Sequence, residues 1–174
     1  MENEILKCLK SRRSIRGFKD TPVPEELVKA ITEAGTYAAS GHGKQSAQIV
    51  AVSNPETIAE LRQMNAAIMG FDGDPYYNAP LILLVFADSN AATWIEDGCC
   101  VTCNMMIAAH SVGLGSCWIN RERQMFDSAQ GRALMRKWGM TDSMRGISAL
   151  AVGYPAVPAL EPKPRKADYC IYVK

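Results

Sequence analysis

The segment Leu81–Ala87 constrains the fold more than any other, because its seven residues, Leu-Ile-Leu-Leu-Val-Phe-Ala, are all apolar. Successive side chains of a strand point to opposite faces of a sheet, so this strand would be apolar on both faces. Such a run is typical of a central strand that is covered on both sides. We therefore expect a sheet with helices against both faces, built by residues 1–174 as one domain.

Turn-forming residues divide the chain into alternating helical and extended segments, which indicates the α+β class. Apolar spacing predicts helices over 2–10, 24–38, 93–112 and 128–138, and one that starts at Pro55 with Asn54 as its N-cap. Strands are predicted over 48–53, 81–87, 115–119 and 146–152. Four of the nine prolines lie in 155–164, so this segment should be an extended arm, and the alternating residues 168–173 predict a terminal strand.

The charge balance excludes some partners. Nineteen Lys and Arg against eighteen Asp and Glu give a net charge of +1, so no overall field favours nucleic acid or an anionic membrane. The first ten residues carry mixed charges, and no apolar stretch is long and uniform enough for a signal peptide or a membrane span. We expect a cytoplasmic protein with neither nucleic-acid nor membrane partners.

The six cysteines do not indicate disulfides, because no other feature suggests secretion. Cys99, Cys100 and Cys103 lie within a predicted helix and lack the second cysteine pair or the histidines of a zinc site. Core packing is the favoured interpretation of these thiols, and a metal or redox role is the alternative. With only His42 and His110 in the chain, a site with several histidines is excluded, and His110 is interpreted as a polar helix position.

Two basic segments indicate an anionic ligand. Residues 11–18, Ser-Arg-Arg-Ser-Ile-Arg-Gly-Phe, bring three guanidiniums and two hydroxyls together between a predicted helix and an extended segment. These groups can converge on a phosphate through charge-assisted hydrogen bonds, although a solvated basic loop is the alternative. Far along the chain, Pro164 holds Lys163 and Arg165 on an extended backbone, from which both can point towards one ligand.

Two glycine-containing segments offer further contacts. The segment Gly113–Trp118 does not match the dinucleotide-binding fingerprint, because Trp118 replaces the third glycine and the order is helix to strand. Its glycines either let the backbone approach a flat ligand or end a helix. Residues 40–46 form a polar loop in which Gln45 can both donate and accept hydrogen bonds.

Taken together and in this order, these segments resemble the FMN-dependent nitroreductase family over nearly the whole chain. The matching motifs are Arg12–Phe18, Ala39-Ser40 with Gln45, Gly113–Trp118, Gly153–Pro155 and Lys163–Arg165. The resemblance implies an α+β, nitroreductase-like fold with a central, mostly antiparallel sheet flanked by helices. It also implies a homodimer with one FMN in each of two interface pockets, and a C-terminal arm, residues 155–174, that crosses to the partner subunit.

The resemblance also implies roles for individual residues. Arg12 and Ser14 would contact the FMN phosphate with Arg13 beside it, and Arg16 would lie near the pyrimidine edge of the flavin. Lys163 and Arg165 would close on the phosphate from the arm, and Leu114 and Gly115 would bring backbone close to the isoalloxazine. Ser40, Gly41 and Gln45 would come from the other subunit. No metal ligand and no catalytic side chain is implied, since the flavin carries the chemistry.

The implied activity is that of an NAD(P)H oxidoreductase that passes hydride in ping-pong fashion through flavin N5 to a nitroaromatic, a quinone or a similar acceptor. A non-catalytic flavin-binding protein, a sensor or store, is the alternative. One departure concerns the loop, where family members commonly carry Pro-Ser and then Asn-x-Gln-Pro-Trp. This chain has Ala39-Ser40 and then Gly-Lys-Gln-Ser-Ala over 43–47, so we expect a different pocket wall on the substrate side.

Overall fold

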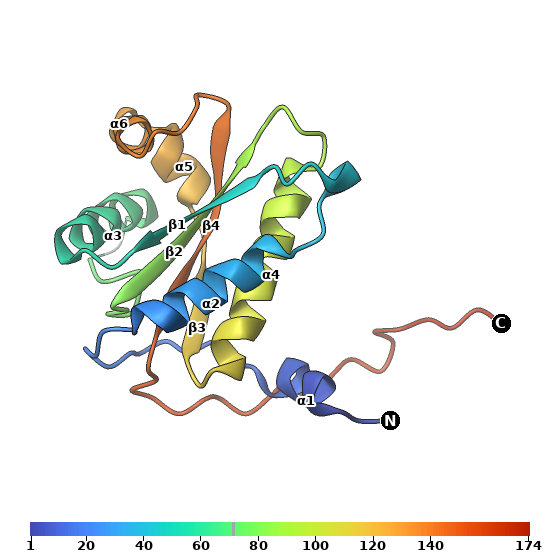
Figure 1. The fold of residues 1–174 in the computed structure, drawn as a ribbon. Coiled ribbons are helices and arrows are strands. Elements are labelled where there is room, and N and C mark those ends of the chain that lie inside the picture. The colour runs from blue at the N-terminus through green and yellow to red at the C-terminus, as the bar shows by residue number, and fades with distance from the viewer. Residues whose placement is uncertain (71) are drawn as a thin grey trace.

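The computed structural model describes residues 1–70 and 72–174. Four strands form one antiparallel sheet in the order β1-β2-β4-β3: β1 (Ala47–Val52), β2 (Leu81–Asp88), β3 (Gly115–Ile119) and β4 (Met144–Gly153). Figure 1 shows that helices lie on both faces of this sheet. The expected α+β architecture is therefore confirmed.

Strand β2 has the central place that its apolar run predicts. Every residue from Leu81 to Ala87 is at most 1% exposed. Ile82, Leu84 and Phe86 belong to the core on one face of the sheet, and Leu81, Leu83 and Val85 belong to the core on the other. The alternation of a strand thus distributes one apolar run between two cores.

Helices α3 (Pro55–Met69), α5 (Glu122–Asp127) and α6 (Ala129–Lys137) cover one face of the sheet, and α2 (Glu25–Thr36) and α4 (Trp94–Ser111) cover the other (Figure 1). Helix α1 (Glu4–Ser11) lies at the C-terminal end of α4. Asn54 caps α3 as expected, because its side chain accepts a hydrogen bond from the Thr57 N–H. None of the helices in the described part of the chain has the length and apolarity to span a bilayer.

Helix α5 was not predicted from the sequence. Its six residues are too few to show a helical repeat, and α6 begins immediately afterwards at the N-cap Ser128. The helix is held by tertiary contacts, since Met125 and Phe126 are completely buried and Phe126 packs edge-on against Phe86 at 4.7 Å between ring centroids.

Two expectations are wrong in this protomer. The terminal strand over 168–173 is not formed, because no strand of the same chain lies alongside to complete its hydrogen bonds. The cysteines do not all pack in the core: Cys117 is buried, but Cys100 and Cys103 are exposed on α4, as is Cys170 on the arm. Within this chain, one side of α4 is therefore left uncovered.

Candidate functional site

A pocket beside β3 brings together the first basic motif and the glycine turn. This pocket, called here the Arg12 pocket, has a volume of about 320 Å³ and is lined by Ser11, Arg12, Arg13, Ile15, His110, the residues 113–116, Pro155 and the residues 157–159. The motif reaches β3 through a parallel bridge between Ser14 and Ser116, with the Ile15 N–H donating to the Ser116 carbonyl at 3.0 Å. Two sequence-distant motifs are thus joined by backbone pairing.

Two polar atoms of the pocket residues have no hydrogen-bond partner among the described residues. Arg12 Nη1 and Ser116 Oγ are both buried, and neither is paired within residues 1–70 and 72–174. A buried donor without a partner costs about 1–3 kcal/mol, and more when it is charged. A guanidinium N–H and a hydroxyl at one pocket therefore favour a bound group rich in oxygen acceptors and carrying negative charge.

Arg13 also lines this pocket but already has partners. Its Nη1 donates to the carbonyls of Lys10 and Arg12 at 2.6 and 2.7 Å. These carbonyls lie at the C-terminal end of α1, where a guanidinium satisfies acceptors that the helix itself leaves unpaired. The geometry gives Arg13 a helix-capping role beside the pocket.

Ser14 and Arg16 continue the motif along β3 without lining the Arg12 pocket. Burial raises the pKa of the neighbouring Cys117 thiol, while the Arg16 and Arg12 guanidiniums act in the opposite direction. Both guanidiniums therefore act on the same stretch of β3, although the Arg16 residue itself is exposed. A ligand held at Arg12 can extend along β3 towards Arg16.

The structure gives packing reasons for the glycine turn. Gly113 has a left-handed φ of 82° just after α4, which supports the interpretation of this residue as a helix terminator. Leu114 is buried in the core between the sheet and α4. A Cβ on Gly115 would lie 2.8 Å from Ile15 Cγ1, so glycine is required where the first basic motif packs on the strand.

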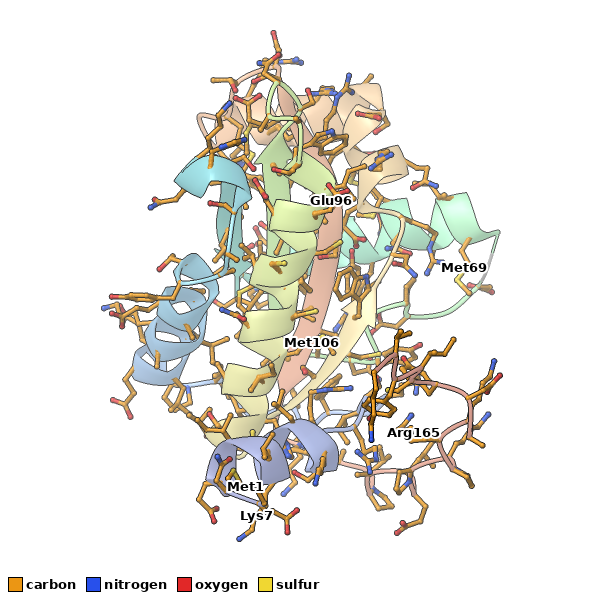
Figure 2. The ribbon with its side chains drawn as sticks, turned by 90° about the vertical axis from the view of Figure 1, so that its right-hand side faces the viewer. Met1, Lys7, Met69, Glu96, Met106 and Arg165 are labelled. Atoms are coloured by element: carbon orange, nitrogen blue, oxygen red, sulfur yellow. The ribbon has the colours of Figure 1, made fainter. Side chains whose placement is uncertain are left out.

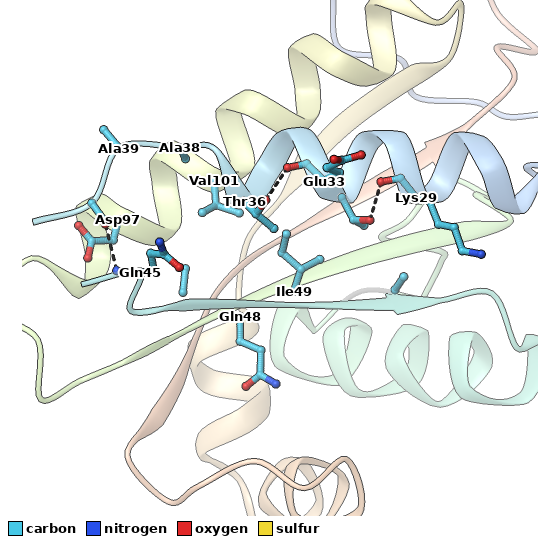
Figure 3. Close-up of a pocket in the computed structure, with 14 residues that line it drawn as sticks. Lys29, Glu33, Thr36, Ala38, Ala39, Gln45, Gln48, Ile49, Asp97 and Val101 are labelled. Atoms are coloured by element: carbon cyan, nitrogen blue, oxygen red, sulfur yellow. Dashed lines mark hydrogen bonds between the residues drawn. The ribbon is translucent and has the colours of Figure 1, made fainter. Parts of the chain in front are cut away.

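The second group of predicted residues lines a different cavity. This cavity, called here the β1 groove, has a volume of about 690 Å³ and lies between α2 and β1, with Gln45 and Asp97 at one end (Figure 3). Ser40 and Val101 also line it. Lys29, Thr32, Glu33 and Thr36 contribute from α2, and Ala47, Gln48, Ile49 and Ala51 from β1. Ser40 and Gln45 are thus separated from the Arg12 pocket within one subunit.

The loop of residues 40–46, which includes the 3-10 turn η1 (Gly41–Gly43), is fixed to α4 by Asp97. Asp97 Oδ1 accepts from the Gly41 N–H at 2.9 Å, and its Oδ2 accepts from Ser46 Oγ at 2.6 Å. Burial favours the neutral acid, but these hydrogen bonds outweigh it and lower the pKa of Asp97. A Cβ on Gly41 would collide with Thr93 Oγ1, so glycine is also required for close packing.

The loop of residues 40–46 and the Arg12 pocket lie at opposite ends of α4. Asp97, in the first turn, holds the loop, whereas His110, in the last turn, lines the Arg12 pocket and its Nε2 lies 2.8 Å from Ser11 Oγ. At 1.5 Å per residue these positions are about 20 Å apart. Figure 1 shows η1 and α1 at these two ends.

The arm begins at the Arg12 pocket and then leaves it. Pro155 and the residues 157–159 line the pocket, and the Ala156 N–H donates to the Gly17 carbonyl at 2.9 Å. From Ala156 onward every residue is exposed, Lys163 and Arg165 included. Figure 2 places Arg165 on this arm, and neither basic residue lines the Arg12 pocket or the β1 groove.

Sequence reasoning gave no ligand role to two polar residues that line the pocket, His110 and Ser116. Ser116 stands within the glycine motif, and the hydroxyl directly after two glycines was an available signal. His110 gave none, because only the contact between α1 and the end of α4 reveals its position.

A model of the nitroreductase family matches residues 9–72. The crystal structure of a nitroreductase with bound FMN from Bacteroides fragilis superposes with a TM-score of 0.91 at 30% sequence identity, over 99% of this chain and 100% of that chain. This chain belongs to the nitroreductase family. As a nitroreductase it is 28% identical to an NADH dehydrogenase/NAD(P)H nitroreductase homologue from Methanothermobacter thermautotrophicus, over 88% of this chain and 78% of the relative. It is 27% identical to an FMN reductase (NADPH) from Bacillus subtilis, over 98% of this chain and 73% of the relative.

Proposed function

We propose that this nitroreductase is an FMN-dependent NAD(P)H oxidoreductase, with the FMN phosphate held in the Arg12 pocket. The observation that carries the proposal is the pair of buried, unpartnered donors on Arg12 and Ser116, which fits a phosphate and no apolar group. The relatives named for FMN reduction and NAD(P)H nitroreduction support the assignment. So does the FMN bound by the Bacteroides fragilis nitroreductase.

In this proposal, the residues of this chain bind FMN and orient its ring. Arg12 and Ser116 hold the phosphate in the Arg12 pocket, with Arg13 beside them, and Ser14 approaches it from the position bridged to Ser116. Arg16 offers its charge to the pyrimidine edge of the flavin farther along β3. Leu114 and Gly115 supply backbone at the ring. When bound, FMN supplies the hydride chemistry, with NAD(P)H and then a nitroaromatic, quinone or similar acceptor using one pocket in turn, a ping-pong pattern.

A homodimer reconciles the two separated groups of site residues. The loop of residues 40–46 and the Arg12 pocket lie about 20 Å apart along α4, so one subunit alone cannot close both around one cofactor. Two copies with antiparallel α4 helices place the loop of each subunit against the Arg12 pocket of the other. Ser40, Gly41 and Gln45 then complete the site from the partner, and two equivalent sites result.

The arm is proposed to cross to the partner and to add a strand there. Strand β1 pairs only with β2 within the described residues, so its other edge offers unpaired backbone groups along the β1 groove. Residues 168–173 alternate, and Tyr169, Ile171 and Val173 are each more than three-quarters exposed. Pairing this segment with the partner's β1 edge would bury these side chains and bring Lys163 and Arg165 towards a phosphate.

The test is to purify the full chain and to record the absorption spectrum and the mass of any ligand that co-purifies. We expect the spectrum and mass of FMN, or uptake of added FMN at one per subunit. A colourless protein that takes up no FMN overturns the proposal. Rapid anaerobic mixing with NADPH or NADH then separates an enzyme from a passive flavin binder, because only the enzyme loses its flavin absorbance at catalytic rates.

The dimer and the arm are tested separately. We expect gel filtration and native mass spectrometry to give a dimer for the full chain. A variant that ends at Pro158 keeps the residues that line the Arg12 pocket up to that point but lacks the rest of the arm. We expect it to bind FMN more weakly, and unchanged dimerisation together with unchanged FMN affinity would contradict the crossing.

A further inference from the structure

The outward side of α4 carries a regular seam of side chains. Glu96, Cys99, Cys103, Met106 and His110 follow one another at intervals of three, four, three and four residues, the spacing by which helices pair side by side. Figure 2 looks onto this side of the helix and labels Glu96 and Met106 on it. The opposite side of α4 is turned to the sheet through Val101, Met105 and Ala109.

Together with the adjacent residues Cys100 and Ile107, the seam residues form matched pairs about Cys103. Glu96 stands seven residues before it and His110 seven residues after it, while Cys99 and Cys100 are matched by Ile107 and Met106. In an antiparallel pair of identical helices related by a twofold axis, residues equidistant from the axis face each other. An axis at Cys103 therefore places the Glu96 carboxylate opposite His110 of the partner subunit, and apolar or thiol side chains opposite each other in between.

The positions of the loop of residues 40–46 and of the Arg12 pocket along α4 indicate the same axis independently. The loop is fixed at Asp97 and the Arg12 pocket reaches α4 at His110, and these must meet between subunits if each site is shared. The midpoint of α4 between these two anchors lies at Cys103 and Asn104. Asn104 is turned to the other side, where its Nδ2 donates to the Ala34 carbonyl of α2 at 3.2 Å. Cys103 is thus the exposed residue left at the axis.

We propose that the two Cys103 thiols of the dimer face each other across its twofold axis and form an inter-subunit disulfide. The inference rests on the proposed dimer. The oxidant is a low-molecular-weight disulfide: one thiolate attacks it and releases one small thiol, and the second Cys103 thiolate displaces the other small thiol. The two cysteine sulfurs are oxidised, the two sulfurs of the reagent are reduced, and two thiols leave.

Such a disulfide would affect FMN binding by holding the two subunits of the dimer together. Each proposed pocket contains residues of both subunits, so dissociation on dilution separates the loop from the Arg12 pocket and releases the cofactor. A covalent link at the axis keeps both halves together at any protein concentration. The redox state of Cys103 would therefore set how well the protein retains FMN when it is dilute.

The experiment uses the full, FMN-loaded chain with Cys170→Ser as background, because Cys170 is an exposed thiol on the arm. Oxidised glutathione is added at a pH of about 8.5, where more of a thiol with a raised pKa is ionised. Partial burial of the thiol and the neighbouring Cys100 raise the pKa of Cys103, against a lowering effect of Arg12. Non-reducing denaturing gels and intact mass measure a species of twice 19.0 kDa.

We expect this species in the background protein and in the matched control Cys100→Ser, and its loss in Cys103→Ser. Dilution should release FMN from the reduced protein and not from the cross-linked one. A protein that gel filtration shows to be dimeric overturns the disulfide, and leaves the dimer standing, if it forms only mixed disulfides with glutathione or still cross-links without Cys103. A monomer on gel filtration removes the proposed dimer and the disulfide with it.

Discussion

The N–H of Gly41 donates a 2.9 Å hydrogen bond to Asp97 Oδ1, and this contact ties a polar loop to the first turn of α4. Ser46 Oγ occupies the other carboxylate oxygen at 2.6 Å. A single buried side chain of α4 therefore fixes both ends of the loop that carries Ser40 and Gln45. The proposed contribution of this loop to the partner's site depends on that anchor.

Replacing Asp97 by alanine should loosen the loop and weaken FMN binding. Two hydrogen bonds to a charged acceptor are lost, each worth about 1.5–3 kcal/mol, so we expect FMN affinity to fall about tenfold or more. Fluorescence titration measures the affinity, and hydrogen exchange of residues 40–46 measures the loosening. Asp97→Asn is the matched control, since it keeps an oxygen for Gly41. Unchanged exchange and affinity in the alanine variant would contradict the anchoring role.

Replacing Arg12 by alanine should affect the loaded and the FMN-free protein differently. Loss of a charge-assisted bond to phosphate should weaken FMN binding about 10- to 150-fold. In the FMN-free protein the change removes a buried, unpaired donor, so the free energy of unfolding should be unchanged or raised. Lys19→Ala, which removes an exposed charge nearby, controls for net charge. Equal FMN affinities in the two variants would refute the phosphate assignment.

Arg13→Ala should lower the stability of the protein more than Arg12→Ala does and weaken FMN binding less. Its guanidinium binds the Lys10 and Arg12 carbonyls at the end of α1, so its loss should lower the free energy of unfolding by about 1 kcal/mol in the absence of FMN. FMN affinity should fall less than in Arg12→Ala. Denaturant unfolding of the FMN-free protein measures the stability. If Arg13→Ala left stability intact and abolished FMN binding, Arg13 would be a ligand residue and not a helix cap.

Stability should depend on the protonation of Glu122, which is fully buried and accepts a hydrogen bond from the Tyr76 hydroxyl at 3.3 Å. Burial raises its pKa from 4.5 to about 8, against the smaller lowering effects of its own N–H, Tyr76 and Arg121. Between these two values the folded state keeps a proton that the unfolded state releases. The contribution of Glu122 to the free energy of unfolding is therefore fully present below pH 4.5. It falls by up to about 1.4 kcal/mol per pH unit as the pH rises towards 8.

Glu122→Gln tests this dependence, because the amide is neutral at every pH and still offers an oxygen to Tyr76. We expect the variant to be more stable than the parent at pH 8 and to lose most of the slope between pH 5 and 8. Denaturant unfolding across this range is the measurement. Parallel stability curves for parent and variant would show that Glu122 is not the titrating group. Glu56→Gln, at an exposed position in the first turn of α3, is the control for removal of one carboxylate.

Several local features of the fold follow from the sequence alone. The apolar run Leu81–Ala87 predicted the strand with a core on each face. The Asn54-Pro55 pair predicted the start of α3, and Gly113 the end of α4. These signals are readable because backbone propensity and apolar spacing act over a few residues.

Other features depend on contacts that no local pattern contains. The six residues of α5 hold their shape through Phe86 and the rest of the core, and Glu122 is buried because α5 lies against the Tyr76 side chain. Core packing was the favoured interpretation of Cys103, yet the structure leaves the outer side of α4 uncovered. An apolar helix surface is equally compatible with a core and with an interface between copies.

By itself, the sequence determined which chemical groups are available: clustered guanidiniums, a glycine turn, a polar loop and a basic arm. Only the tertiary structure decided how they are grouped, since backbone pairing between Ser14 and Ser116 joins the first two into one pocket. It also decided that the loop stands apart, because the rigid length of α4 separates its anchor Asp97 from His110. The separation of the loop from the Arg12 pocket depends on hydrogen bonds and packing between residues far apart in the sequence. Local residue type does not encode such contacts.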